Sequence, residues 1–368
     1  EISECLVGSE MCIRDRHSEG KTNLKVNVPE DGKCYLKIIY HLKKKLPLLD
    51  GDHILGFDEI EVSKEDTKCK LAEKWLQKTA VDSELQVSEN DTQIHIKGRE
   101  FAYTIDKRTA LFTEMKFAGR EYLNHPMELN IWRAPTDNDM YIKSEWKKAH
   151  YDKAYTRAYT TEVVQGKHGV KITSHASVVA ETVQKILDVT ITWKIEAAGK
   201  IDADIAVTKD DEFPDLPRFG VRMFLDKKLS AVRYFGMGPQ ESYCDKHQAA
   251  SHGLYRADVG DLHEDYIRPQ ENGSHYDCEY VEFNNSRYGI AASAEKAFSF
   301  NASYYTQEEL EKKTHNYELI ESDSVVFCVD YALNGIGSNS CGPVVLEQYR
   351  FDDVLFRFQF TLIPYVKG

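Results

Sequence analysis

Four short polar segments, punctuated by glycine and proline, contain the side chains most able to do chemistry. They are WRAPTDND (132–139), GMGPQESYCD (236–245), YIRPQENG (266–273) and GIGSNSCGP (335–343). Loops of this kind between strands commonly carry binding groups. Asp137 and Asp139, beside Arg133, could coordinate a cation or act as acid and base, but they are also ordinary turn chemistry. Their spacing favours the structural interpretation.

Two glutamates in these segments, Glu241 and Glu271, each lie beside a glutamine. Acids and amides in loops are suitable hydrogen-bond partners for sugar hydroxyls, and they equally satisfy backbone N–H groups where strands end. Cys341 would be a nucleophile only with a histidine partner, and the sequence places none beside it. The signatures of zinc proteases, phosphate-binding loops, serine hydrolases and dinucleotide-binding turns are absent from the sequence. The residues alone predict a site for a small polar ligand.

Composition excludes several classes of partner. The 368 residues include 47 basic and 60 acidic side chains, a net charge of −13, which argues against binding to nucleic acid. No apolar run approaches the roughly 18 residues needed to span a bilayer, so we expect no membrane partner. The eight cysteines form no C-x-x-C pair, so we expect free thiols, no metal site and a cytoplasmic location.

Alternating apolar residues predict strands along most of the chain. Residues 24–28, 36–42 and 57–62 predict a small antiparallel sandwich over residues 17–82. Residues 83–368 predict one large antiparallel domain, in which the segments 187–195 and 201–207 form a hairpin about Gly199 and residues 356–362 form a packed strand. Few helices are expected: one over 143–154, and one begun by a capping box of Thr306 and Glu309.

The first 16 residues, EISECLVGSEMCIRDR, have neither a signal-peptide pattern nor a clear period. The string CLVGSEMCIRDR resembles a translated sequencing-library adapter. We therefore interpret residues 1–16 as a non-native scar and exclude them from fold reasoning.

The four polar segments, in this order, resemble the C-terminal β-supersandwich domain of bacterial β-galactosidases of glycoside hydrolase family 2. They also resemble the small subunit of two-chain β-galactosidases. The resemblance runs from about Leu85 to Val366, and LLDGDHILGFDEIEV (48–62) is similar to the small immunoglobulin-like sandwich that precedes that domain. It implies an all-β chain: an incomplete immunoglobulin-like sandwich followed by a supersandwich of galactose-mutarotase-like type.

The resemblance implies hydrolysis of terminal β-D-galactosides such as lactose with retention, by two glutamates about 5–5.5 Å apart. In this family both glutamates belong to a (β/α)₈ barrel, whose strand–helix alternation is absent from this sequence. We therefore expect no catalytic residue here, inactivity of the chain alone, a barrel domain or large subunit as partner, and an oligomer. The family's magnesium and sodium ions are bound mainly outside this region.

The resemblance also implies a substrate-binding loop. In the family a loop of this domain forms one wall of the galactoside pocket, with an aromatic residue in some members. The corresponding segment is GIGSNSCGP, where Cys341 stands about where a tryptophan would stack on the sugar. We expect Asn339, Ser340 and Cys341 to contact the sugar instead.

Two alternatives remain open. The supersandwich is similar to the galactose-mutarotase fold, so the chain could be a free-standing sugar mutarotase that uses a histidine and a glutamate as acid and base. It could also be a non-catalytic carbohydrate-binding module. Fold alone does not separate these functions, because function resides in the site.

Overall fold

The computed structural model describes residues 23–30, 32–63, 70–76, 85–182 and 185–367. Contacts divide the chain into two compact units, Glu1–Thr67 and Lys68–Gly368. The sequence predicted this division at residues 82 and 83, after the short helix α1 (Glu73–Leu76), which the contacts assign to the large unit. The proposed scar over residues 1–16 lies outside the described residues.

In the described part of the small unit, β1 (Tyr35–His41) and β2 (Ile54–Glu61) form an antiparallel pair. The pairing confirms two of the strands predicted there. The strand predicted over residues 24–28 is wrong, because residues 23–29 have no strand structure and Leu24 and Val26 are exposed. Alternation alone does not make a strand, since the backbone N–H and C=O groups also need a partner strand. The immunoglobulin-like sandwich over residues 17–82 remains a prediction.

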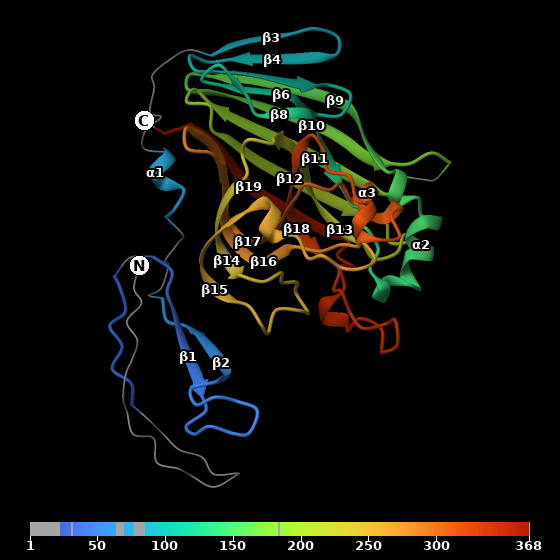
Figure 1. Cartoon of the computed structure of the whole chain (residues 1–368). Coiled ribbons are helices and arrows are strands. Elements are labelled where there is room, and N and C mark those ends of the chain that lie inside the picture. The colour runs from blue at the N-terminus through green and yellow to red at the C-terminus, as the bar shows by residue number, and fades with distance from the viewer. Residues whose placement is uncertain (1–22, 31, 64–69, 77–84, 183–184, 368) are drawn as a thin grey trace. The chain divides into compact units, whose positions relative to one another are not determined.

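The large unit contains a 12-stranded and a 5-stranded antiparallel sheet within the described residues, which confirms the all-β class (Figure 1). The large sheet follows the order β15-β14-β16-β17-β19-β12-β11-β10-β9, and β13, β18 and β8 branch from it. The small sheet runs β3-β4-β5-β6-β7. The bounds are β3 (Gln86–Glu89), β4 (Gln93–Lys97), β5 (Phe101–Asp106), β6 (Leu111–Phe117), β7 (Arg120–Glu121), β8 (Leu123–Asn130), β9 (Tyr155–Gly166), β10 (Gly169–Val179), β11 (Leu187–Glu196), β12 (Ile201–Lys209), β13 (Arg218–Asp226), β14 (Ala231–Gly238), β15 (Ser251–Asp258), β16 (Ser274–Asn284), β17 (Tyr288–Ser303), β18 (Ser324–Leu333) and β19 (Leu355–Val366).

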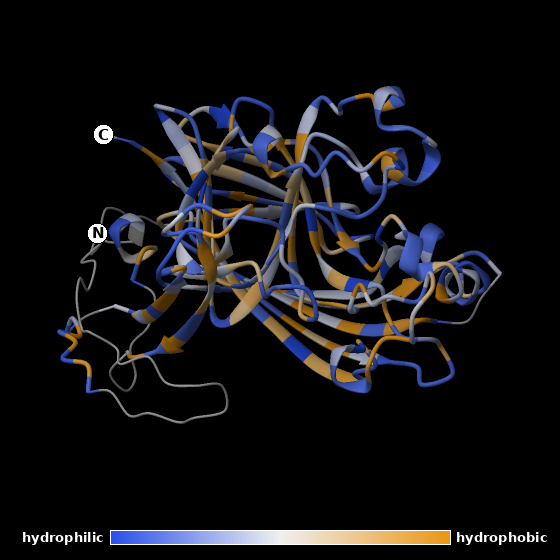
Figure 2. Ribbon diagram, turned by 60° about the horizontal axis from the view of Figure 1, so that its bottom comes forward, coloured by the Kyte–Doolittle hydropathy of each residue, from blue (hydrophilic) through white to orange (hydrophobic). Residues whose placement is uncertain are grey.

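The hairpin of β11 and β12 is confirmed. Ile191 lies opposite Ile205, and both are fully buried. Gly199 takes a φ of +88° in the turn, a conformation that side chains with a Cβ rarely adopt. Trp193, also fully buried, donates its indole N–H to the carbonyl of Ala110 at 2.8 Å. Figure 2 shows hydrophobic and hydrophilic residues interleaved along such strands, as expected for strands with one face in the core.

Strand β19 lies between β12 and β17 in the middle of the large sheet. The alternating residues predicted to face the core are all buried, namely Phe356, Phe358, Phe360 and Leu362. The predicted packed strand is therefore confirmed.

Both predicted helices are present and short. Helix α2 (Ile142–Lys148) ends before the predicted limit of residue 154, and a separate 3-10 turn follows at Tyr151–Lys153. Helices α2 and α3 (Gln307–Lys312) lie beside each other and are joined by an ion pair of Lys147 with Glu311 (Figure 1). Thr306 caps α3 by accepting a hydrogen bond from the Glu309 N–H at 3.1 Å. The reciprocal half of the predicted capping box is wrong, because the Glu309 carboxylate accepts the N–H of Ile320 instead. No described helix has the length and apolarity needed to cross a membrane.

A second, smaller apolar cluster lies on the face of the large sheet away from the main core. It is centred on Trp75 of α1, whose ring stacks on Tyr365 with centroids 3.5 Å apart. The cluster consists of Ala72, Trp75, Tyr280, Ala291, Ile363 and Tyr365. The segment that enters the large unit is therefore attached to the outer face of its sheet.

Candidate functional site

The four polar segments lie together in the structure. The backbone N–H of Glu271 donates to the carbonyl of Ala134 at 3.0 Å, which joins the third segment to the first. The side-chain amide of Asn138 donates to the carbonyl of Gly337, 199 positions away, at 2.7 Å, which joins the first segment to the fourth. We call residues 132–139, 236–245, 266–273 and 334–343 the loop cluster.

Arg133 is the centre of the loop cluster. Its guanidinium is fully buried and donates to both carboxylate oxygens of Asp139, at 3.2 and 2.7 Å. It also donates to the carbonyls of Asn334 and Gly335, where the fourth segment begins. Asp139 further accepts the N–H of Thr136 at 2.8 Å. These contacts support the structural interpretation of this acidic turn, because Asp139 is occupied by protein donors.

Asp245, the last residue of the second segment, holds the same loop from another side. Its carboxylate accepts the backbone N–H groups of Ile336 and Gly337 at 2.9 and 2.7 Å. A Cβ on Gly335 would lie 2.9 Å from Asp245 Oδ2, so this close approach requires glycine. Gly337 has a φ of +63°, again a glycine conformation. The buried Arg133 and the half-buried Asp245 therefore fix the start of the loop.

The three predicted sugar contacts lie in the turn that follows. Ser340 donates its hydroxyl to Asn138 Oδ1 at 2.9 Å, and the Cys341 N–H donates to the carbonyl of Ser338 at 3.3 Å. Ser340 and Cys341 are exposed, and Asn339 is half-buried. The turn thus presents small polar groups to solvent from a fixed base, and the contact of Asn339, Ser340 and Cys341 with sugar stays a prediction.

The two loop glutamates are engaged by the protein itself. Glu241 accepts the N–H of Gly273 at 2.9 Å and pairs with Lys246 and with the hydroxyl of Tyr266. Glu271 is buried and pairs with Arg218 at 3.3 Å. The contacts of Glu241 and Glu271 are therefore those of residues that support the loops, and they leave these side chains poorly placed to contact a ligand.

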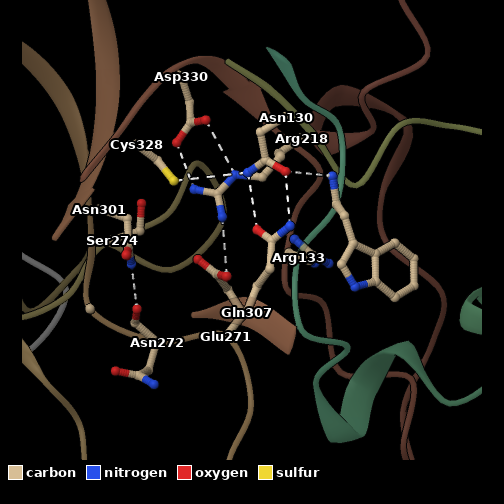
Figure 3. A network of polar contacts seen from close by, with 12 residues as sticks. Asn130, Arg133, Arg218, Glu271, Asn272, Ser274, Asn301, Gln307, Cys328 and Asp330 are labelled. Atoms are coloured by element: carbon tan, nitrogen blue, oxygen red, sulfur yellow. Dashed lines mark hydrogen bonds and ion pairs between the residues drawn. The ribbon is translucent and has the colours of Figure 1, made fainter. Parts of the chain in front are cut away.

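A buried polar network lies beneath the loop cluster (Figure 3). Arg218 on β13 donates to Asp330 on β18 at 2.6 and 3.2 Å as well as to Glu271. Asn130 and Gln307 exchange two amide hydrogen bonds, each of 3.0 Å. The network joins strands β8, β13 and β18 to helix α3 and, through Glu271, to the third polar segment.

The sequence analysis missed Arg218 and Asp330. Asp330 is the one charged residue in the apolar run SVVFCVDYAL, and a lone acid in such a run indicates a buried ion pair. Gly220, opposite Asp330, confirms how tightly it is enclosed, because a Cβ there would lie 2.2 Å from Asp330 Oδ1. That signal identifies Asp330 but not its partner, which is 112 positions away.

Burial sets the electrostatics of the network. Desolvation raises the pKa of both Glu271 and Asp330, and the Arg218 guanidinium opposes this effect in each case. Glu271 Oε1 and the hydroxyl of Tyr243 have no hydrogen-bond partner among the described residues. An ion network of this kind positions its neighbours, and its burial removes it from direct contact with a substrate.

His275, the second residue of β16, is buried against the rings of Tyr234 and Phe300, with centroids 4.5 and 5.0 Å away. This burial lowers the pKa of His275 from 6.5 to about 4. As the pH falls below 6.5, the unfolded chain binds a proton before the folded chain does. Neutral His275 therefore contributes fully to the free energy of unfolding above pH 6.5. This contribution is lost as the pH falls toward 4.

Replacement of His275 with phenylalanine is expected to remove this pH dependence. Between pH 7 and pH 5 the parent chain should lose about 2 kcal/mol more of its free energy of unfolding than the variant, measured by urea titration. His175→Phe, at an exposed position of β10, is the matched control and should behave as the parent. An unchanged pH dependence in His275→Phe would contradict the assignment.

No group of three or more His, Cys, Asp or Glu side chains is placed to hold a metal ion within the described parts of the chain. The arrangement that the structure does present is a rigidly supported polar loop with an exposed tip.

Comparisons with known proteins match this region. A family model described as "Beta galactosidase small chain" matches residues 97–362. A beta-galactosidase of Actinobacillus pleuropneumoniae is 42% identical over 328 residues, which are 89% of this chain and 32% of that protein. A beta-galactosidase of Staphylococcus xylosus is 33% identical over 282 residues, 76% of this chain and 28% of that protein.

A solved structure of galactose 1-epimerase from Lactobacillus acidophilus NCFM is similar at a TM-score of 0.40 and 8% identity, covering 78% of this chain and all of that one. The chain spans about a third of the length of the curated relatives it matches.

Proposed function

This chain belongs to the beta galactosidase small chain family, and we propose that it completes a β-galactosidase as its C-terminal region or small subunit. In this proposal the full enzyme hydrolyses terminal β-D-galactosides such as lactose with retention. The chain contributes one wall of the sugar-binding cleft, and a barrel domain or large subunit contributes the two catalytic glutamates.

The observation that carries the proposal is the construction of the loop at 334–343. Arg133 and Asp245 fix its base, and three small polar residues stand at or near the surface of its tip. A preorganised loop can bind a sugar hydroxyl without first losing conformational freedom. The carboxylates of the loop cluster are engaged in its support, which suits a binding role better than a catalytic one.

The remaining features of the proposal concern the rest of the enzyme. The magnesium and sodium ions that the resemblance implies are bound mainly outside this region. The complete enzyme is a cytoplasmic oligomer, and neither nucleic acid nor membrane is among its partners.

The proposal is tested by mixing the purified chain with the remaining, barrel-containing part of the Actinobacillus pleuropneumoniae relative, which is 42% identical in the shared region. Hydrolysis of a nitrophenyl β-galactoside is measured for each part alone and for the mixture. We expect turnover by the mixture and none above buffer for this chain. Robust turnover by this chain alone would refute the assignment of the catalytic groups to the barrel.

The same mixture tests the sugar contacts. Asn339→Ala and Cys341→Ala should raise KM for the galactoside about ten-fold with a smaller effect on kcat, because they remove contacts made in the bound complex. Asp91→Ala, in the exposed turn between β3 and β4, is the control. Acceleration of galactose mutarotation by the chain alone would favour the mutarotase alternative, and galactose affinity without any partner would favour a binding module.

A further inference from the structure

A basic pocket lies on the outer face of the large sheet, beside the Trp75 cluster and away from the loop cluster. Its volume is about 470 Å³, within the range of small-molecule sites. Three of its lining side chains are cationic and one is acidic. The lining residues are Ala231, Val232, Arg233, Arg256, Ala257, Glu282, Asn284 and Lys367.

The strand register brings two of the cations together. Arg233 on β14 lies directly opposite Arg256 on β15, and on its other side it lies opposite Glu282 on β16. Residues directly opposite each other in an antiparallel pair share a face of the sheet, and like charges in that arrangement repel. An anion between Arg233 and Arg256 would remove this repulsion.

Glu282 is already shared among several donors. Its Oε2 accepts the indole N–H of Trp75 at 3.2 Å and the hydroxyl of Tyr280, and Lys74 lies 3.6 Å away. Arg233 approaches the other oxygen only to 3.8 Å. Among the described residues that line the pocket, Glu282 is the one carboxylate, and it lies beside Lys74, Arg233, Arg256 and Lys367.

Two further observations indicate excess positive charge. Arg233 Nε is buried and has no hydrogen-bond partner among the described residues, although an arginine donor in such a position requires an acceptor. Burial lowers the pKa of Lys74, and the charge of Glu282 opposes this, while the charges of Arg233 and Lys367 lower it further. The chain as a whole is strongly acidic, with a net charge of −13, so this concentration of cations is local.

We propose that this pocket binds a phosphate group, carried by free phosphate or by a small phosphorylated molecule. Arginine presents planar, paired N–H donors that match phosphate oxygens, and Lys367 adds a third cation to the lining of the pocket. The pocket is larger than a phosphate ion, which leaves room for the organic part of a phosphate ester beside Ala231 and Ala257.

The test is calorimetric titration of the full 368-residue chain with inorganic phosphate and, separately, with galactose 6-phosphate, against sodium chloride at matched ionic strength. We expect saturable binding with a Kd of about 1 mM or below. Arg256→Gln and Arg233→Gln should each weaken it about ten-fold, since each removes a charge-assisted partner. Arg157→Gln, at an exposed position of β9, removes the same charge elsewhere and should leave the Kd unchanged.

Tighter binding of the ester would identify a phosphorylated small molecule as the ligand, and equal binding would identify free phosphate. No saturable binding of either probe, or equal affinity in the parent, Arg256→Gln and Arg157→Gln, would overturn the proposal. Because Arg256 is exposed, its replacement carries the test even if Arg233→Gln does not fold.

Discussion

Replacement of Arg218 with methionine is expected to lower the free energy of unfolding by about 3–5 kcal/mol, measured by urea titration. Arg218 is buried and is paired with Asp330 and Glu271, which are themselves almost fully buried. Methionine fills much of the same volume but leaves two carboxyls in a low-dielectric environment without their cation. Most of the lost free energy of unfolding comes from burying these two carboxylates without a cation, and less comes from the loss of a favourable ion pair.

A double variant separates these two causes. Arg218→Met combined with Asp330→Leu removes both members of the shortest pair, and it should recover part of the stability lost by the single variant. Arg357→Met is the control, because its pair with Asp204 is exposed and such pairs contribute little. If Arg218→Met were as stable as Arg357→Met, the buried network would not be the structural base described above.

Replacement of Asp245 with alanine is expected to lower kcat/KM of the reconstituted enzyme about 100-fold for a nitrophenyl galactoside. The variant leaves the N–H groups of Ile336 and Gly337 without their acceptor and removes the side chain on which Gly335 packs. The loop tip then loses its fixed position, and small displacements at a binding site have large kinetic effects.

Asp245→Asn distinguishes positioning from charge. The asparagine oxygen can still accept one of the two N–H groups, so its kcat/KM should fall between those of the parent and of Asp245→Ala. Asp91→Ala, remote from the loop, should retain full activity. Because the predicted loss concerns one loop, the unfolding free energy of Asp245→Ala should change far less than its kcat/KM. Full activity of Asp245→Ala would show that the loop at 334–343 does not contact substrate.

Parts of the large unit could be predicted because strands such as β11, β12 and β19 alternate between buried and more exposed residues. The hairpin predicted at 187–207 is correct in position, and the strand predicted at 356–362 lies within β19. The segment at 24–28 has the same alternation without the structure. The alternation of this segment does not show whether another strand lies beside it, because strand pairing depends on residues elsewhere in the chain.

The loop cluster was only partly predictable. Each polar segment was identifiable from its glycines, prolines and charged groups, but their convergence depends on the order of strands in the sheet. The partners of Arg133 illustrate the difference. Asp139 is six residues away, within the same turn, whereas the carbonyls of Asn334 and Gly335 are about two hundred residues away. Local chemistry identifies the first contact, and only the folded topology produces the others.

The central position of β19 in the large sheet has a consequence for biosynthesis. The hydroxyl of Thr361 on β19 donates to Asp202 on β12, and these residues are 159 positions apart. During synthesis on the ribosome, β12 is therefore made long before β19, the strand that pairs with its edge. The apolar residues of β12 remain exposed until β19 has been synthesised. Such non-local pairing slows folding. Newly made chains should consequently depend on chaperones that shield open β-edges, and expression at reduced temperature should increase the yield of folded protein.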